Sequence, residues 1–325
     1  MLKVSIIIPV YKAEKYIEKC ARSVFEQTYS NLEIVFVNDC TPDNSLQVIK
    51  DVLECYPVRK SQVAILYQEV NKGVAAARKK GLDYITGDYC IQFDSDDFVD
   101  STMIESLVEV AEKENSDIVF CDYNLVTNNI VKHIHVNPKL QPIECMKQLL
   151  KCEIHGSLWN KLIRLDLYRN HDVQFMEGLN MREDFSVMYR LLYYAKRLAY
   201  VPKPLYNYVL RVGSVSDGRM NAMQQRDTQN LLIEMDEFCA KSNITDQNLI
   251  FAFFQFKAQV KTGILLFGNI KELKTNLYKG IRIQHYCSHP ILPFPHKIMG
   301  ILSESHFMPL VWAYRKIVDI LLSLK

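Results

Sequence analysis

The amino-acid sequence predicts an α/β fold, a mostly parallel sheet with helices on both faces, followed by a helical C-terminal extension. Apolar runs typical of strands alternate four times with helix-like segments between residues 4 and 93, which is the pattern of such a sheet. A cluster of polar or turn-forming residues follows each of these runs. From residue 219 onward the apolar spacing is helical.

Each element follows from the spacing of its apolar residues. Residues 4–10 form a nearly continuous apolar run, which is typical of a strand buried on both faces. The runs at 32–37 and 63–67, and the short aromatic-containing run at 87–93, are also predicted to be strands. The remaining predicted elements are helices at 15–26, 45–53, 74–85, 143–151, 185–194, 221–241, 246–267 and 309–325, strands at 116–123, 130–136 and 198–209, and a breaker-rich linker at 289–296.

The bulk composition favours a globular protein. The 325 residues are 49% hydrophobic and 23% charged, and the net charge of +2 gives no global field that would attract nucleic acid. Nine scattered cysteines without a CxxC pair favour reduced thiols over disulfides or zinc. The N-terminal residues lack the layout of a signal peptide, and no uninterrupted apolar run is long enough for a membrane span. We therefore expect a cytoplasmic protein that at most touches the inner face of a membrane.

Three carboxylates follow the fourth predicted strand. Asp94, Asp96 and Asp97 come directly after residues 87–93, and because aspartate is a poor strand former they must lie past the end of the strand. Adjacent negative charges repel one another in a compact site unless they are neutralised. Carboxylate oxygens suit Mg²⁺ or Mn²⁺, and phosphate oxygens would complete the ligand shell. The cluster therefore predicts a metal site that holds a phosphate.

Two other interpretations of this acidic cluster stay open. Acidic residues commonly cap helices, and a helix is predicted to begin near Ser101. The spacing of the acids also partly matches a calcium-binding loop, but Val99 occupies the position at which that loop requires glycine. The acids concerned are Asp94, Asp96, Asp100 and Glu105.

The polar clusters after the first four predicted strands would all lie at one edge of a parallel sheet, where ligands of such sheets bind. A dinucleotide-binding fold would carry a GxGxxG turn after its first strand, but residues 9–14 contain no glycine, and a phosphate-binding loop of the Walker type is missing too. A bound phosphate would therefore be held by metal and side chains.

Four sequence blocks together resemble the family-2 glycosyltransferases. Their order and spacing match that family, and they are residues 5–11 (SIIIPVY), residues 37–39 (VND) with Asp43 and Ser45, Asn71-x-Gly73 with residues 77–78 (AR), and residues 94–97 (DSDD). The resemblance implies the GT-A fold and an inverting transfer from a nucleotide-diphosphate sugar. Asn38, Cys40 and Lys79 depart from the family pattern, in ways that concern the shape of turns more than chemistry.

Most roles implied by the resemblance concern the nucleotide. Tyr11 would lie against the base and Asp39 would hydrogen-bond it, with Pro9 beside them. Asn71 and Gly73 would shape a loop around the nucleotide. A simpler interpretation of Tyr11, as a packed aromatic residue, stays open.

Other implied roles concern the diphosphate and the metal. Arg78 would reach the nucleotide or its phosphates, and Asp94 would approach the ribose. Asp96, together with Asp94, would bind Mn²⁺ or Mg²⁺ at the diphosphate, and Asp97 would orient the acceptor side or the loop. Arg211 would clamp the diphosphate, although Arg211 as a surface charge and Arg78 as a solvated helix charge stay open.

Residues 156–162 (GSLWNKL) and 180–185 (NMREDF) resemble the acceptor half of the same family. Asp184 stands where the family keeps its catalytic base, and Trp159, Lys161 and Glu183 would lie on the acceptor side. An inverting transfer is a single displacement, so one base suffices, while a metal stabilises the departing diphosphate. Alternatively, the two acids only begin the helix predicted to follow them.

The eight histidines are scattered, and none pairs at metal-ligand spacing, so each is expected to be structural or solvated. The predicted helix at 309–325 carries an apolar stripe that suits either a packed core or a helix resting on a membrane. The stripe consists of Leu310, Tyr314, Ile317, Val318, Leu321 and Leu322, opposite Arg315, Lys316 and Asp319.

We therefore expect a nucleotide-sugar-binding α/β domain at 1–125, an acceptor-binding and catalytic segment of the same domain at 126–218, and a helical extension at 219–325. The expected function is metal-dependent transfer of a hexosyl or N-acetylhexosaminyl group to a hydroxyl of a saccharide or lipid-linked saccharide, in polysaccharide or glycan biosynthesis. The alternatives are a nucleotidyltransferase that forms a sugar nucleotide and a non-catalytic nucleotide- or saccharide-binding module.

Overall fold

The structure is a computed structural model that describes residues 1–127, 130–211, 220–305 and 308–323, without the side chains of residues 319–323. The chain divides into two compact units. The first consists of Met1–Cys145 and Gly156–Val215, and the second of Met146–His155 and Ser216–Lys325.

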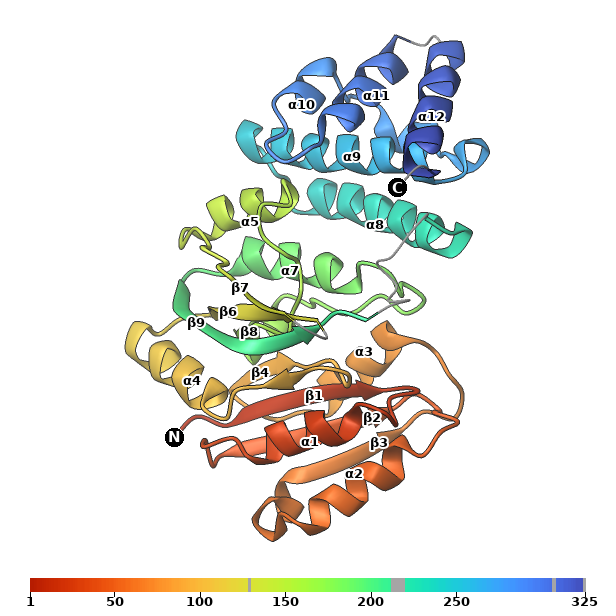
Figure 1. Cartoon of the computed structure of the whole chain (residues 1–325). Coiled ribbons are helices and arrows are strands. Elements are labelled where there is room, and N and C mark those ends of the chain that lie inside the picture. The colour runs from red at the N-terminus through yellow and green to blue at the C-terminus, as the bar shows by residue number, and fades with distance from the viewer. Residues whose placement is uncertain (128–129, 212–219, 306–307, 324–325) are drawn as a thin grey trace. The chain divides into compact units, whose positions relative to one another are not determined.

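The first unit is built on one mixed sheet (Figure 1). In the described residues the strand order is β3-β2-β1-β4-β8-β6-β9-β5, with β7 paired to β6. The strands β3, β2, β1 and β4 are parallel, as predicted, whereas antiparallel pairs join β8, β7 and β5 to the rest. The strands are β1 (Val4–Val10), β2 (Leu32–Asn38), β3 (Val63–Tyr67), β4 (Tyr89–Gln92), β5 (Phe98–Val99), β6 (Ile118–Val126), β7 (Val131–Ile134), β8 (Lys161–Arg164) and β9 (Leu198–Val209).

Helices cover both faces of this sheet, as predicted. Ile6 and Ile8 of β1 share a core with α1 (Ile17–Phe25), α2 (Ser45–Glu54) and α4 (Met103–Glu114). Ile7 points to the other face, where a Cβ on Gly81 of α3 (Val74–Tyr84) would lie only 2.4 Å from its Cγ2. The remaining helical elements of the unit are η1 (Pro57–Gln62), α5 (Pro142–Leu150), which continues into the second unit, α6 (Leu165–Asn170) and α7 (Glu183–Tyr194).

The carboxyl ends of β1, β2 and β3 are level with one another, because Val10 pairs with Asn38 and Asn38 pairs with Tyr67. β4 ends at Gln92, which pairs with Ile7, three residues before the end of β1. Because all four strands run in the same direction, the residues that follow them lie at the same edge of the sheet. This edge carries the predicted polar clusters.

The second unit is helical, in agreement with the predicted C-terminal extension. The long helix α9 is apolar enough to span a bilayer, but 67% of its most apolar window is buried within the structure, which is equally typical of a core helix. The elements are α8 (Ala222–Lys241), α9 (Gln247–Phe267), η2 (Ile270–Glu272), η3 (Thr275–Tyr278), α10 (Ile283–Cys287), α11 (Phe294–Glu304) and α12 (Met308–Ser323).

Two sequence predictions for this unit are corrected. The linker predicted at 289–296 ends in a helix, because α11 begins at Phe294, directly after a proline that suits a helix start. The apolar stripe of α12 does not share one environment. Tyr314 and Val318 pack against a small core, whereas Leu310 and Ile317 are 45% and 53% exposed.

His289 makes the second unit sensitive to acid. Its side chain is fully buried and neither ring nitrogen has a hydrogen-bond partner. Burial, with the charges of Lys297 and Lys151, lowers the pKa of His289 to about 4. Between pH 6.5 and 4 this histidine binds a proton in the unfolded chain but stays neutral in the folded one. The free energy of unfolding therefore falls as the pH falls through this range.

Through His289, the wild type is expected to lose on the order of 2 to 3 kcal/mol of its free energy of unfolding between pH 7 and pH 4. The variant His289→Phe should not show this loss. The measurement is urea unfolding followed by circular dichroism across this pH range. The control is the difference between variant and wild type at each pH, which cancels the other titrating groups. A difference that does not change with pH would contradict the buried neutral histidine.

Candidate active site

The loops after β1 and β2 are joined by a hydrogen-bond network centred on Asp43. Its carboxylate accepts from the backbone N–H of Glu14 at 3.0 Å and from the hydroxyls of Thr41 and Ser45 at 2.7 and 2.6 Å. These bonds lower the pKa of Asp43 to about 2, against an opposing effect of burial. Cys40, which departs from the family pattern, has the left-handed backbone (φ 53°) that favours glycine, so the departure does concern turn shape.

Asp39 organises the loop that precedes α3. Its side chain is buried, and it accepts from the backbone N–H groups of Lys72 and Gly73 at 2.8 and 2.9 Å. Gly73 has φ 88°, and a Cβ there would lie 1.9 Å from Oδ1 of Asn180, so the position requires glycine. Asn71 lies exposed in the same loop.

Tyr11 is 43% exposed at the end of β1, directly after Pro9 and Val10, so the packed-aromatic interpretation is wrong. A second exposed ring at this edge, Tyr16, was missed in the sequence. The guanidinium of Arg211 lies 3.7 Å from the centre of this ring and forms an ion pair with Asp96. Arg211 is therefore bound at the acidic cluster, which rules out an isolated surface charge.

Arg78 forms the centre of the site. It is 2% exposed, so it is not a solvated helix charge. Its guanidinium donates to Asp94 at 2.8 Å, and its Nε lies 3.5 Å from Asp184 and 3.7 Å from Glu183. Burial alone would lower the pKa of Arg78, but the nearby carboxylates, Asp184 above all, raise it. Residues that are about 90 positions apart in the sequence thus meet around one cation.

The acids around Arg78 outnumber its single charge. Burial, countered by Arg78, raises the pKa of Asp94 to about 6. Burial and the Asp184 carboxylate raise the pKa of Glu183 to about 8. Oδ1 of Asp184 is buried without a hydrogen-bond partner. This surplus of negative charge favours a cation, which an all-oxygen donor set would bind as Mg²⁺ or Mn²⁺.

The backbone positions Glu183 and Asp184 at the first turn of α7. Arg182, which precedes the helix, has φ 66°, a conformation that costs a non-glycine residue roughly 1 kcal/mol or more. The helix begins two residues earlier than predicted, so both acids lie at its N-terminus, where the helix dipole favours negative charge.

Asp97 faces the protein interior. It is 3% exposed and accepts from the Tyr206 hydroxyl and the Val209 backbone N–H, both at 2.8 Å. Burial, with the charges of Asp94 and Asp96, raises the pKa of Asp97 to about 8. Tyr206 also accepts from the backbone N–H of Asp94 at 3.2 Å. Asp97 and Tyr206 therefore fix the acidic loop to β9, and Tyr206 was not identified from the sequence.

Trp159 and Lys161 also lie in the interior. Trp159 is 4% exposed and stacks on Tyr206 with ring centres 4.4 Å apart. Lys161 is 1% exposed and donates to the Ser157 carbonyl and to Asn160 Oδ1, while burial lowers its pKa to about 8. The structure thus brings Asp94, Asp184, Glu183 and Arg78 close together, whereas Trp159 and Lys161 are buried in the interior.

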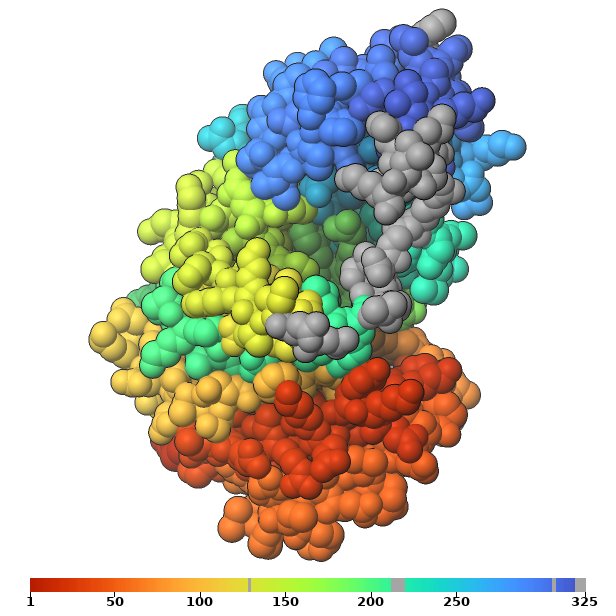
Figure 2. All heavy atoms as spheres, in the orientation of Figure 1, coloured from red at the N-terminus to blue at the C-terminus, as the bar shows by residue number. Residues whose placement is uncertain are grey.

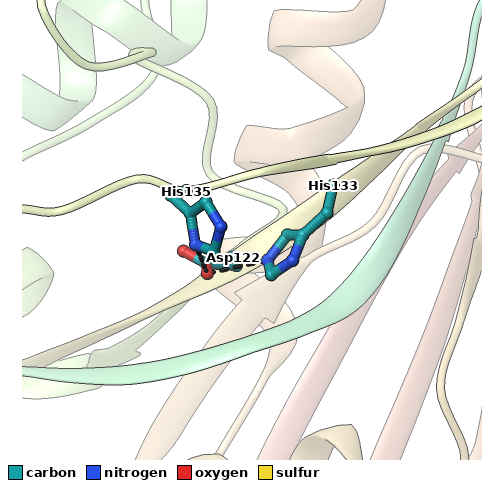
Figure 3. A group of neighbouring side chains, drawn as sticks. All are labelled: Asp122, His133 and His135. Atoms are coloured by element: carbon teal, nitrogen blue, oxygen red, sulfur yellow. Dashed lines mark hydrogen bonds and ion pairs between the residues drawn. The ribbon is translucent and has the colours of Figure 1, made fainter.

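The expectation that no histidine pairs at metal-ligand spacing is wrong. His133 and His135 alternate along and just beyond β7, and their rings converge on Asp122 of β6 (Figure 3). The sequence signal was the His-x-His spacing, which places two side chains on one face of a strand. All nine cysteines lie in the described residues, and none of them forms a disulfide there.

The sequence is similar to those of known proteins. A family model described as Glycosyl transferase family 2 matches residues 5–170. The putative glycosyltransferase EpsH of Bacillus subtilis (strain 168) is 31% identical over 65% of this chain and 62% of its own length. The uncharacterized glycosyltransferase EpsJ of the same organism is 31% identical over 63% of this chain and 60% of its length. The chain thus spans about three fifths of these relatives.

A solved structure resembles the whole chain. The crystal structure of S. aureus TarS 1–349 in complex with UDP-GlcNAc has a TM-score of 0.72 and covers 98% of this chain and 91% of that one. The two sequences are 17% identical. At this identity the likeness establishes a shared fold.

Proposed function

Because this chain belongs to glycosyl transferase family 2, we propose that it transfers a sugar, with inversion, from a nucleotide-diphosphate sugar to a hydroxyl of a saccharide or lipid-linked saccharide. The family and the GT-A fold expected from the four sequence blocks are confirmed. The class of donor, the class of acceptor and the inversion at the anomeric carbon are what we propose. The complexes of TarS with UDP-GlcNAc and UDP support a uridine nucleotide as the first donor to test.

One observation carries the proposal. The acids at the carboxyl end of β4 and those at the start of α7 share Arg78, with Asp94 2.8 Å and Asp184 3.5 Å from its guanidinium. A donor site and a base must lie this close together if one group is to activate the acceptor beside the donor. A module that only bound a nucleotide would need the first set of acids and not the second.

The donor half of the site is proposed at the strand ends. Tyr11 offers an exposed ring to the base, while Pro9, Asp39, Asn71 and Gly73 form the edge and the loop beside it. Both carboxylate oxygens of Asp39 already accept from that loop or from Gln68, so its contribution to base binding would come through the loop as well as directly.

Asp96 and Asp94 are the residues that would hold Mn²⁺ or Mg²⁺. Asp96 fits this role because its side chain is 46% exposed and its ion-pair partner, Arg211, is itself a suitable diphosphate clamp. The cation would supply charge stabilisation to the departing diphosphate. Arg211 would then exchange its carboxylate partner for phosphate oxygens.

Asp184 is proposed as the general base. Its Oδ1 is buried, makes no hydrogen bond and lies 3.5 Å from Nε of Arg78. This oxygen would take the acceptor's hydroxyl proton as the hydroxyl oxygen attacks the anomeric carbon and the bond from that carbon to the diphosphate breaks. A single displacement of this kind inverts the anomeric carbon. Glu183 would border the acceptor side. Asp97, Trp159 and Lys161 would support it from the interior.

The alternative nucleotidyltransferase is disfavoured by the turn after β1, which contains no glycine to cradle a triphosphate. The cytoplasmic location stays a prediction. Membrane contact through 309–325 also stays a prediction. The exposed apolar side chains of Leu310, Trp312 and Ile317, near the exposed Lys316, support it.

Replacement Asp96→Ala is expected to abolish metal-dependent nucleotide binding. The measurement is calorimetric titration of UDP and GDP, with and without Mn²⁺, into wild type and variant. We expect wild type to bind one nucleotide more tightly with Mn²⁺, and Asp96→Ala to lose that gain. The control is Asp51→Ala, which removes an exposed carboxylate from α2. Binding that ignores both metal and Asp96 would contradict the donor site.

A further inference from the structure

Strand register brings together a second group of side chains that could bind a metal, and none of them belongs to the acids around Arg78. In the antiparallel pairing of β6 with β7, Tyr123 lies opposite Ile134 and Asn124 opposite His133. Extending this register places Asp122 opposite His135. Because side chains alternate along strands, His133 and His135 project from the same face, and Asp122 projects with them (Figure 3).

The contacts of Asp122 are divided between its two oxygens. Oδ1 accepts from the backbone N–H of Val136 at 2.8 Å and from the hydroxyl of Tyr200. Oδ2 is left to the imidazoles, with Nε2 of His133 at 2.9 Å and Nδ1 of His135 at 3.0 Å. Asp122 is completely buried, so its carboxylate is held in one position. A fixed carboxylate with one oxygen aimed at two imidazoles is a preorganised partial ligand set.

We propose that Asp122, His133 and His135 form a binding site for Zn²⁺ or a similar borderline divalent cation. The three candidate ligand atoms all lie within 4.8 Å of one another. In a tetrahedral site with ligand distances of about 2 Å, neighbouring ligand atoms are about 3.3 Å apart, so the observed 2.9 and 3.0 Å need only a small expansion.

The chemistry of the ligands separates this site from the proposed donor site. Two imidazoles and one carboxylate suit Zn²⁺, Co²⁺ or Ni²⁺, whereas the oxygen-only acids at the end of β4 suit Mg²⁺ or Mn²⁺. The Asp122 carboxylate accepts hydrogen bonds from Tyr200, Val136 and the two histidines, which orient it as a ligand.

The site is open to solvent on one side. The side chains of His133 and His135 are 35% and 61% exposed, and the yellow segment that contains β7 forms part of the visible surface in Figure 2. A cation can therefore enter without unfolding, and water can fill the fourth position. On binding, each ring would move its proton to its other nitrogen, since the atoms that now donate to Asp122 become the ligands. The bound ion would cross-link β6 to the segment containing β7.

The test uses the full chain, free of any affinity tag and stripped of metal by a chelator, in an Asp96→Ala background that removes the donor-site metal ligand. Co²⁺ is titrated and followed by the visible absorption of tetrahedral cobalt, and Zn²⁺ is then titrated by calorimetry. The variants His133→Ala and His135→Ala each remove one ligand. His171→Ala is the matched control, because His171 is an exposed histidine of the same unit that stacks on Tyr194.

We expect one equivalent of Zn²⁺ to bind to the background protein and to the His171→Ala control, with an intense cobalt spectrum. Removing either ligand should weaken binding by about tenfold or more and abolish that spectrum. Circular dichroism confirms that each variant is folded. Three results would each overturn the proposal: no tetrahedral cobalt spectrum, equal affinity with and without His135, or equal weakening in the His171→Ala control. The cluster would then be a hydrogen-bonded group only.

Discussion

Replacing Asp184 with asparagine is expected to lower kcat by about 10²–10⁴-fold, the range by which a positioned general base accelerates a reaction. Asparagine keeps the size of the side chain but cannot accept the proton of the acceptor hydroxyl. The affinity for the donor nucleotide should change little, because the proposed donor ligands lie at the strand ends. The measurement is steady-state transfer from the donor identified by calorimetry, together with nucleotide binding to the same variant.

Glu183→Gln is the matched control for this prediction. Glu183 is the neighbouring residue on the same helical turn, and its pKa of about 8 means that it is mostly neutral at pH 7. A neutral amide in its place should therefore change kcat only by a few-fold. Comparable losses in both variants would contradict the assignment of the base to Asp184. Unchanged turnover of Asp184→Asn would favour another base, and nucleotide binding without any turnover in wild type would favour the non-catalytic module.

Arg78→Met is expected to destabilise the first unit by about 3–5 kcal/mol, the cost of removing one partner from a buried ion pair. Methionine fills much of the volume, but Asp94, Glu183 and Asp184 would lose the cation that they share. In a unit of this size such a loss lowers the melting temperature by roughly 10 °C. Thermal unfolding followed by circular dichroism measures the effect, and transfer activity should be lost as well.

The neighbouring Lys79→Met provides the control. Lys79 lies on the outer side of α3 and pairs with Asp83 one turn away, with side chains 32% and 51% exposed. A pair of this kind contributes only about 0.5 kcal/mol or less. If Arg78→Met and Lys79→Met had the same melting temperature, the three carboxyl groups would not depend on Arg78. The assignment of Arg78 as the electrostatic centre of the site would then be wrong.

Much of the fold, and the meeting of the strand-end residues at one edge of the sheet, could be predicted from the sequence, because both depend on local patterns. The runs at 4–10, 32–37 and 63–67 are mostly apolar, which predicts strands, and Asp94 had to follow a strand rather than lie within it. Parallel strands then bring Tyr11, Asp39 and Asp94 to one edge of the sheet.

Only the tertiary structure decided which charges are paired and which side chains are buried. Arg78 has the sequence context of any helix charge, and its burial depends on Asp184, which is distant in the sequence. Trp159 and Lys161 match a site motif, yet sheet packing places them in the interior. Register decided that Asp122 meets His133 and His135. A sequence pattern determines whether an element is a helix or a strand and roughly where it ends. The pairing of strands determines which residues that are distant in the sequence are buried together. In such a low-dielectric environment each charge shifts the pKa of its neighbours.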